Sequence, residues 1–372
     1  LYDLHVKSGA RLDDFYDWQM PQHYGSAIDE HMHVRADAGL FDLSHMMIID
    51  INGAGCEQFL RHLLSIDVRS LYTVGQAKYS LMLNLQGGII DDLIVYRMPM
   101  GYRLVTNCAT RKRIKIWLEQ QHQALGVPDI NIRYRKDLSL LSMQGPKAFV
   151  QLFQLIYTQY EGDREFGLLH AQFEHAKDMT TFQSRLLGDI HLSRTGYTGE
   201  AGVEIILPHK LAVRLWSDLI GINVQPCGLV ARDSLRLEAG LASSGQDMDE
   251  TTRPNETRLN WALDLSDPKR DFIGRELSQT TSPRFVTRSF VLRGRGIPQP
   301  QQGLFAPNSD KQLGEVISGT FSPSLKLGIG FARMPPKRIQ DLEIELRQGR
   351  QSIALVQGPF VRDNEQAYKL VQ

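Results

Sequence analysis

The sequence predicts a protein of the α+β class, and three observations lead to that prediction. The 372 residues are 42% hydrophobic and 23% charged, the composition of a globular chain long enough for two or three domains. Between residues 46 and 250, segments with strand and helix patterns alternate irregularly, which favours α+β over a doubly wound parallel sheet. Beyond residue 285, short strand-like runs broken by Gly and Pro indicate a separate small β domain.

The charge of the chain limits which binding partners are expected, and its cysteines indicate a compartment. Lys and Arg number 42, as do Asp and Glu, so the net charge is 42 − 42 = 0. Without a basic block we expect neither nucleic acid nor a membrane as partner, but a small molecule or a protein. Cys56, Cys108 and Cys227 are far apart and odd in number, which indicates a reducing compartment, the cytoplasm or the mitochondrial matrix in a eukaryote.

The first segment predicts a short helix followed by a strand. Ser26 and Asp29 are spaced as in a capping box, so we expect a helix through His31 to Asp37 that Gly39 closes. The strand Met46–Ile51 should follow at once.

An antiparallel meander is expected next. Its three strands would be Tyr79–Leu85, Ile89–Tyr96 and Tyr102–Asn107, with a tight turn at Gly87–Gly88. Apolar residues on one helical stripe then predict a helix over 109–125.

The middle of the chain predicts a second α+β region. Strands are expected at Leu138–Gln144, Ile190–Arg194 and Val203–Leu207, and helices near Lys210–Leu219 and Ala231–Ala239. The polar stretch Ser278–Pro283 is typical of a linker. We therefore divide the chain into a catalytic region of two interleaved α+β domains over 1–276, a linker over 277–284 and a β domain over 285–372.

Several motifs fail the tests for other chemistries. Gly294-x-Gly296 and Gly328-x-Gly330 lack the third glycine of a dinucleotide fingerprint. His31 and His33, two apart on a helix, point to different faces and cannot chelate one metal, so we expect surface or partly buried histidines. No Gly-x-Ser-x-Gly elbow is present, which gives hydrolysis by a covalent triad little support.

Two adjacent carboxylates stand out in the second strand of the meander. Asp91 and Asp92 follow Ile89–Ile90, although carboxylates are depleted in strand centres and costly to bury unpaired. Alternation puts them on opposite faces of the strand and does not say which one has a task. An edge strand with one solvated and one hydrogen-bonded Asp would also explain the pair.

Charged residues elsewhere raise the same question. Glu204 lies in an apolar strand after the Gly-rich turn 195–200, where a carboxylate can accept from a ligand with adjacent N–H donors. Arg232 and Arg236 are spaced i, i+4, so both can face one cleft or one salt-bridge network. For Arg236 and Glu238 we favour structural ion pairs.

Together these segments resemble one family, the tetrahydrofolate-dependent aminomethyltransferases known as T-proteins of the glycine cleavage system. The resemblance covers nearly the whole chain in order and is carried by the motifs Asp42–Met46, Gly87–Leu93, Gly196–Glu204, Ala231–Gly240, Asp271–Glu276 and Ser318–Pro323. It implies three domains in a cloverleaf around a central folate channel, the last a β barrel.

The resemblance also implies a reaction and its residues. An aminomethyl group on the lipoyl arm of the H-protein would pass its carbon to tetrahydrofolate, with no metal or redox cofactor. Asp91 matches the catalytic carboxylate, whose charge would stabilise an iminium-like cation. Glu204 matches the pterin-binding Glu and Arg232 a substrate-binding Arg. Positions that line the folate pocket match Tyr197, Asn107, Tyr79 and Trp261, although ordinary core packing would also explain Tyr79 and Trp261.

The chain also departs from the family pattern. Ser243–Ser244 stand where relatives carry an aromatic residue, and Thr251–Arg258 is unusually polar, which could loosen the pocket wall. Tyr368 is out of register with a substrate-binding tyrosine of some members. The alternative functions are a folate-dependent demethylase and a non-catalytic folate-binding assembly factor; the second typically carries a reactive Cys motif that this chain lacks.

Overall fold

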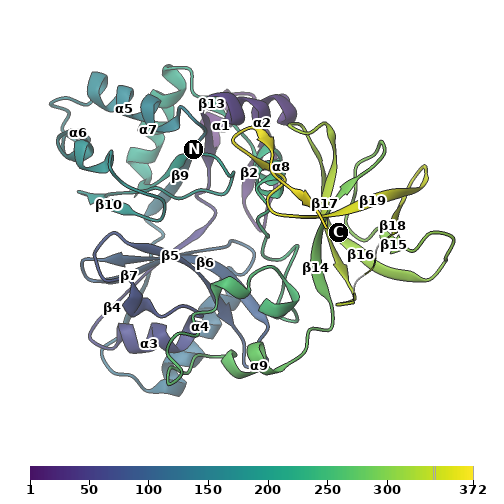
Figure 1. Ribbon diagram of the computed structural model, residues 1–372. Coiled ribbons are helices and arrows are strands. Elements are labelled where there is room, and N and C mark those ends of the chain that lie inside the picture. The colour runs from purple at the N-terminus through teal and green to yellow at the C-terminus, as the bar shows by residue number, and fades with distance from the viewer. Residues whose placement is uncertain (338, 340, 372) are drawn as a thin grey trace.

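The chain folds into three lobes, each built around its own sheet (Figure 1). The computed structural model describes residues 1–337, 339 and 341–371. We call the lobes the first lobe, the second lobe and the barrel lobe. This three-lobed α+β arrangement, with a closed barrel at the C-terminal end, confirms the expected fold class.

The first lobe contains the expected meander. Its five-stranded sheet has the order β5-β6-β7-β4-β8, with strands β4 (Met47–Asn52), β5 (Ala77–Leu83), β6 (Ile89–Met98), β7 (Gly101–Thr106) and β8 (Asn131–Tyr134). All of its pairings are antiparallel.

Two helices cover one face of this sheet. They are α3 (Cys56–Leu63) and α4 (Arg111–Leu125), and both lie on the side away from the second lobe (Figure 1). Gly126 ends α4 in the left-handed conformation, at φ 58°, as expected for a C-terminal cap. The 3₁₀ turn η1 (Val68–Ser70) follows α3.

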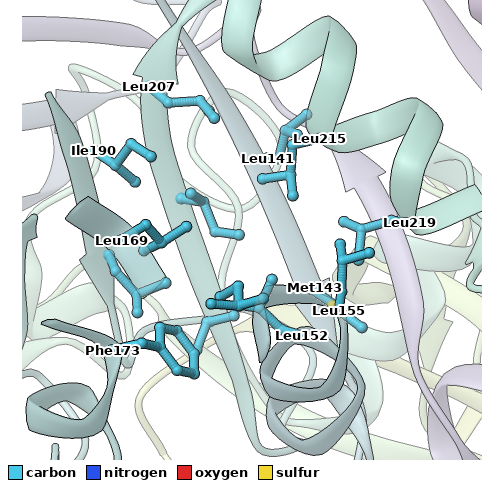
Figure 2. Close-up of a cluster of buried hydrophobic side chains, with 14 of the residues drawn as sticks. Leu141, Met143, Leu152, Leu155, Leu169, Phe173, Ile190, Leu207, Leu215 and Leu219 are labelled. Carbon is cyan, nitrogen blue, oxygen red and sulfur yellow. The ribbon is translucent and has the colours of Figure 1, made fainter. Parts of the chain in front are cut away.

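The second lobe has a six-stranded sheet in the order β10-β11-β12-β9-β3-β13. The strands are β3 (Gly39–Asp42), β9 (Leu138–Gln144), β10 (Ser184–Leu187), β11 (Ile190–Ser193), β12 (Gly202–Pro208) and β13 (Gln225–Pro226). Helices α5 (Ala148–Gln159), α6 (Gly167–Gln172) and α7 (His209–Gly221), with the turn η2 (Phe173–Ala176), cover one face. Figure 2 shows the core between them, in which leucines of β9 and β12 meet leucines of α5 and α7.

Elements from both ends of this region complete the second lobe. They are α1 (Tyr2–Lys7), the hairpin β1 (Arg11–Asp14) and β2 (Gln19–His23), α2 (Ala27–Ala36) and α8 (Leu229–Glu238). The Ser26 hydroxyl caps α2 by accepting from the Asp29 N–H at 3.2 Å, as predicted. The expectation that Gly39 closes the helix is wrong. Gly39 begins β3, where an added Cβ would lie 2.4 Å from Val34.

The barrel lobe closes on itself. Its order is β14-β17-β16-β15-β18-β19, and β14 pairs again with β19, so six strands form a closed ring. The strands are β14 (Val286–Leu292), β15 (Gly303–Phe305), β16 (Gln312–Ser322), β17 (Leu327–Met334), β18 (Leu342–Leu346) and β19 (Gly349–Gln357). A C-terminal extension adds β20 (Val361–Arg362), β21 (Glu365–Gln366) and β22 (Lys369–Leu370).

A long segment returns from the second lobe to the first before the barrel begins. It contains η3 (Pro254–Glu256), η4 (Asn260–Ala262) and α9 (Arg275–Thr280). Phe272 packs there with Leu81 and Ile89 of the meander, so the first two lobes are interleaved in the chain. Beyond α9 the backbone leads into β14.

The two open sheets face each other. Along β6, Leu93 and Val95 belong to the core under α3 and α4, whereas Tyr96 belongs to the cluster that packs between the two sheets. Along β12, Ile206 belongs to that same cluster between the sheets. Alternation therefore directs Asp92 and Glu204 toward the interface between the lobes.

Candidate active site

A cavity of about 390 Å³ lies where the three lobes meet. Its size falls within the range of about 300 to 1,000 Å³ that is usual for small-molecule sites. Six of the seven site residues expected from sequence line it: Tyr79, Asn107, Tyr197, Glu204, Arg232 and Trp261. Asp92 lines it as well, although no role was expected for it. Thr287 and Phe331 of the barrel lobe contribute to the same wall.

Asp91, the expected catalytic carboxylate, is absent from the cavity wall. Its side chain has no exposed surface, and it lies on the face of β6 that α3 and α4 cover. The family resemblance implied a catalytic role for Asp91, but the geometry favours Asp92 for direct contact with a ligand. The reason is the period of the strand, which sends neighbouring residues to opposite faces. The strand is also not an edge strand, because β6 pairs with both β5 and β7.

Asn107 connects the two carboxylates. Its side-chain amide donates to Asp91 Oδ1 and to Asp92 Oδ1, each at 2.9 Å, and its backbone N–H donates to Asp91 Oδ2 at 3.0 Å. Tyr79 Oη donates to Asp92 Oδ2 at 3.0 Å. Asp92 is therefore held from two sides while it faces the cavity.

Asp91 and Asp92 are two neighbouring acidic groups without a cation in direct contact among the described residues, and the pKa of each is raised. Burial, followed by the charge of Asp92, raises the pKa of Asp91 to about 7, and burial raises the pKa of Asp92 as well. Because like charges this close resist joint ionisation, the titrations of the two groups are coupled. Burial also keeps the pKa of Tyr79 well above 10, so its hydroxyl remains a donor.

Glu204 faces the cavity from the opposite sheet with few partners. The Thr195 hydroxyl donates to Glu204 Oε2. Burial raises the pKa of the Glu204 carboxyl, and the hydrogen bond from Thr195 and the charge of Arg232 oppose that rise. This carboxylate can accept further N–H donors from a ligand.

Arg232 lies in the same wall and is held by stacking. Its guanidinium lies 4.5 Å from the centre of the Tyr197 ring. Burial lowers its pKa, while the nearby Tyr197 and Glu204 oppose that shift. Tyr197 is itself fixed by a hydrogen bond from its hydroxyl to the Ala242 carbonyl.

Trp261 forms part of the rim. Its ring stacks on Tyr79 with centroids 5.0 Å apart and an interplanar angle of 29°. Ordinary core packing does not explain this residue, because 65% of its surface is exposed. This aromatic pair at the cavity wall can offer a ring face to a flat heterocycle.

The two arginines of α8 have separate tasks. Arg236, which is fully buried, pairs with Asp233 at 2.9 Å and Asp247 at 2.6 Å, which confirms the expected structural ion pairs. Arg232, one turn earlier, faces the cavity.

Glu238 also has a structural role. Its carboxylate accepts from Arg35 Nη2 at 2.8 Å, from Ser324 Oγ at 2.9 Å and from the Ser322 hydroxyl, and it lies 3.1 Å from His31 Nε2. We call His31, Arg35, Glu238, Ser322 and Ser324 the clasp, because it joins α2 and α8 to the barrel lobe. His31 was expected at or near the surface; it is fully buried instead, since this carboxylate and Ser234 meet both of its ring nitrogens.

Some residues of the cavity escaped the sequence analysis. Thr195 lies in the Gly-rich turn, which was singled out only as a landmark before Glu204. Arg258 lies in the polar stretch that was noted as a departure. Both are polar residues beside a recognised motif, which is the only feature that could have identified them. Neither lies in a strand or helix pattern that would show where its side chain points.

A second cavity of about 350 Å³ adjoins the first. The two share five wall residues, namely Met46, Asn107, Tyr197, Arg232 and Ser243. The buried ring of His45 lines the second cavity, and burial lowers its pKa to about 3, which keeps it neutral. Asn107 and Arg232 can therefore be approached from two cavities.

Within 1–337, 339 and 341–371, no three His, Cys, Asp or Glu side chains converge in a way that could hold a metal ion. Across the same part of the chain, each helix lacks the length or the apolar character needed to cross a bilayer.

Comparison with known families accounts for nearly the whole chain. Residues 1–267 match the family model of the GCVT N-terminal domain, and residues 286–362 match that of the glycine cleavage T-protein C-terminal barrel domain. The aminomethyltransferase of Alcanivorax borkumensis is 42% identical over 372 residues, covering 99% of this chain and 98% of that protein. The aminomethyltransferase of Xanthomonas axonopodis pv. citri is 40% identical over 370 residues, covering 98% and 96%.

The fold has a close counterpart among crystal structures. The glycine cleavage system aminomethyltransferase T from Bartonella henselae superposes with a TM-score of 0.87 at 31% identity, covering 98% of each chain. Sequence and structure thus agree over all three lobes. The chain belongs to the glycine cleavage T-protein family, whose members are aminomethyltransferases.

Proposed function

We propose that this enzyme transfers the methylene carbon of an aminomethyl group, carried on the lipoyl arm of an H-protein, to tetrahydrofolate. Two folate nitrogens each form a bond to that carbon, and the carbon's bonds to the amine nitrogen and to the lipoyl sulfur break. The two N–H protons of the folate leave with ammonia and with the free thiol. The products are 5,10-methylenetetrahydrofolate, ammonia and the dihydrolipoyl arm.

The observation that carries this proposal is one cavity walled by two carboxylates from opposite sheets. Asp92 and Glu204 both face it, and the guanidinium of Arg232 lies in the same wall. A pterin presents an amino group and ring N–H donors on one edge, which suit the two oxygens of the Glu204 carboxylate. The rings of Tyr79, Trp261 and Tyr197 would flank the heterocycle.

We assign Asp92 the catalytic role that the family resemblance implied for Asp91. Transfer requires a positive charge on the methylene carbon and its nitrogen, and a carboxylate in the cavity wall stabilises that charge in place. Asp91 acts as a positioning residue through Asn107, which also orients Asp92. Burial raises the pKa of both carboxyl groups, and the charge of Asp92 raises that of Asp91 further, so the two share a proton more readily than separate carboxylates do.

The second cavity supports a reaction with two large substrates. A folate that occupies the first cavity would leave the second, which also reaches Asn107 and Arg232, free for the aminomethyl arm. Holding both reactants against one carboxylate is the main contribution that an enzyme without a resident cofactor can make.

The experiment is an assay of 5,10-methylenetetrahydrofolate formation with purified aminomethylated H-protein and tetrahydrofolate. We expect product with the wild type and about a hundredfold less with Asp92→Asn. Folate binding without product formation would favour the folate-binding assembly factor instead. Transfer of a methyl group from a methylated donor to tetrahydrofolate, but no product from H-protein, would favour the demethylase.

Two further assignments belong to this proposal. The division into a catalytic region over 1–276, a linker over 277–284 and a barrel domain over 285–372 is supported by the ends of the two family matches, at 267 and 286. A reducing compartment, the cytoplasm or a mitochondrial matrix, suits the three cysteines, all of which are free and buried.

A further inference from the structure

Arg258 is a half-buried cation in the wall of the first cavity. It comes from the polar stretch Thr251–Arg258 and lies on the barrel side. Its Nη1 donates to Ser289 Oγ at 2.7 Å, its Nη2 lies 3.4 Å from the Gly358 carbonyl, and its guanidinium is 5.7 Å from the centre of the Phe331 ring.

The charge of this guanidinium is not balanced by the protein. Among the described residues, no carboxylate lies within 4.0 Å of Arg258, and its two hydrogen-bond acceptors are neutral oxygens. A guanidinium has five N–H donors, so several remain open toward the cavity. Burial lowers its pKa, with no opposing contribution from an acidic neighbour.

Arginines that are more deeply buried than Arg258 are satisfied within the protein: Arg270 donates four hydrogen bonds to backbone carbonyls, and others form ion pairs. Arg35 pairs with Glu200 and Glu238, and Arg236 pairs with Asp233 and Asp247. A buried charge lowers the stability of the folded state unless it is paired, and the planar guanidinium of an arginine suits a carboxylate as partner. The unpaired fork at Arg258 therefore points to an anion supplied by a ligand.

The position of Arg258 separates it from the head of the proposed substrate. Asp92 and Glu204 lie on the two open sheets, whereas Arg258 contacts residues of the barrel lobe, Ser289 on β14 and Phe331 on β17. A ligand that places a pterin between the sheets would present its other end to a different wall. In tetrahydrofolate that other end is a glutamate, which carries two carboxylates.

We propose that Arg258 binds a carboxylate of the glutamyl tail of tetrahydrofolate and so makes this site selective for folates over pterins that lack the tail. This inference rests on the proposed function. Arg258 is a specificity residue, and the pterin contacts at Glu204 do not depend on it.

The test compares two ligands that share the reduced pterin head. Binding of tetrahydrofolate and of 6-methyltetrahydropterin, which has no benzoylglutamate, is measured by anaerobic calorimetry with wild type and Arg258→Met. We expect the variant to bind tetrahydrofolate about tenfold more weakly, the loss of one charge-assisted contact, and 6-methyltetrahydropterin as the wild type does. Arg288→Met, on the exposed face of the neighbouring β14, is the matched control and should change neither affinity.

Each other result has a distinct meaning. Equal weakening of both ligands by Arg258→Met, or unchanged affinity for both, would overturn the assignment. Failure of the wild type to bind either ligand would overturn the proposed function itself. If Arg258→Met does not fold, Arg258→Lys decides: it keeps the charge without the fork, so a loss confined to tetrahydrofolate still supports the proposal, and no selective loss contradicts it.

Discussion

The clasp and the cavity wall are two buried groups of charged side chains that differ in how their charges are balanced. In the clasp, Glu238 is fully buried, yet the contacts with His31, Arg35 and two serines lower its pKa to about 2. Behind the cavity wall, Asp91 is equally buried, and burial with the charge of Asp92 raises its pKa to about 7. Burial alone therefore does not set the direction of the shift; the partners do.

This difference separates charge that holds the fold from charge that is kept for a ligand. The clasp joins two elements of the second lobe to the barrel lobe, and its charges are matched within the protein. Four charged side chains line the cavity, and their charges are not paired with one another as those of the clasp are. They are Asp92, Glu204, Arg232 and Arg258. Perturbed carboxylates in a cavity are typical of functional sites, and the comparison shows the physical cause.

The largest expected effect is on the clasp. Glu238→Gln removes the charge that His31 and Arg35 share and puts an amide donor among donors, so we expect the free energy of unfolding to fall by about 3 to 5 kcal/mol. Urea unfolding measures this. A variant as stable as the wild type would show that the clasp is not a structural pair, and the comparison drawn above would fail.

Asp92→Asn should act on turnover rather than on stability. It removes the negative charge that faces the cavity while keeping the shape, so kcat should fall by about a hundredfold with the free energy of unfolding nearly unchanged. Steady-state assays of methylenetetrahydrofolate formation provide the measurement. Asp91→Asn is the matched control, with a smaller expected loss; the reverse order would return the catalytic role to Asp91.

Glu204→Gln should weaken folate binding without harming the fold. The variant presents a donor to the donors of the pterin, so tetrahydrofolate affinity should fall at least about tenfold. Because the native carboxylate is buried without a close cation, stability should be unchanged or slightly higher. Calorimetric titration and a thermal melt test both statements, and equal affinities would remove Glu204 from the pterin site.

The smallest effect is a pH dependence of opposite sign in the two clusters. The folded state binds a proton at Asp91 more tightly than the unfolded chain, where an Asp titrates near 3.9, so this group's contribution to stability declines as pH rises from about 4 to about 7. Glu238 has a lowered pKa, so its contribution is present above about pH 4 and is lost as pH falls toward 2.

Urea unfolding at pH 5, 6, 7 and 8 isolates the first contribution. The stability of the wild type relative to Asp91→Asn should decrease between pH 5 and 7 and then level off. A constant difference over this range would show that Asp91 is ionised throughout, with a pKa that is not raised.

Much of the fold was predictable because its patterns are local. The meander follows from period-two alternation around Gly87–Gly88, and α4 from an apolar stripe that ends at Gly126. The family resemblance, the fold class and the enzyme class are confirmed by the family matches and the similar crystal structure. Local patterns combined with ordered motifs were sufficient for these conclusions.

The sequence did not predict which face of a sheet is buried, or which residues far apart in the chain contact each other. Sequence alternation placed Asp91 and Asp92 on opposite faces but gave no sign of which face the helices cover, since that depends on how the two sheets meet. His31 pairs with Glu238, more than 200 residues away, so no local pattern indicates its burial. The same holds for Arg258, whose neighbours come from the barrel lobe.

Trp261 gives the molecule a built-in optical reporter. Indole emission shifts with the polarity and stacking of its surroundings, and this ring lies at the cavity rim, largely in water and against Tyr79. Trp117 and Trp216, by contrast, are enclosed in the cores of the first and second lobes, where a ligand does not reach them. Trp18, in the turn between β1 and β2, is not part of the wall of the first cavity. A molecule that entered the first cavity would therefore contact Trp261 alone among the four tryptophans and change its emission, so that occupancy could be followed in real time without a label.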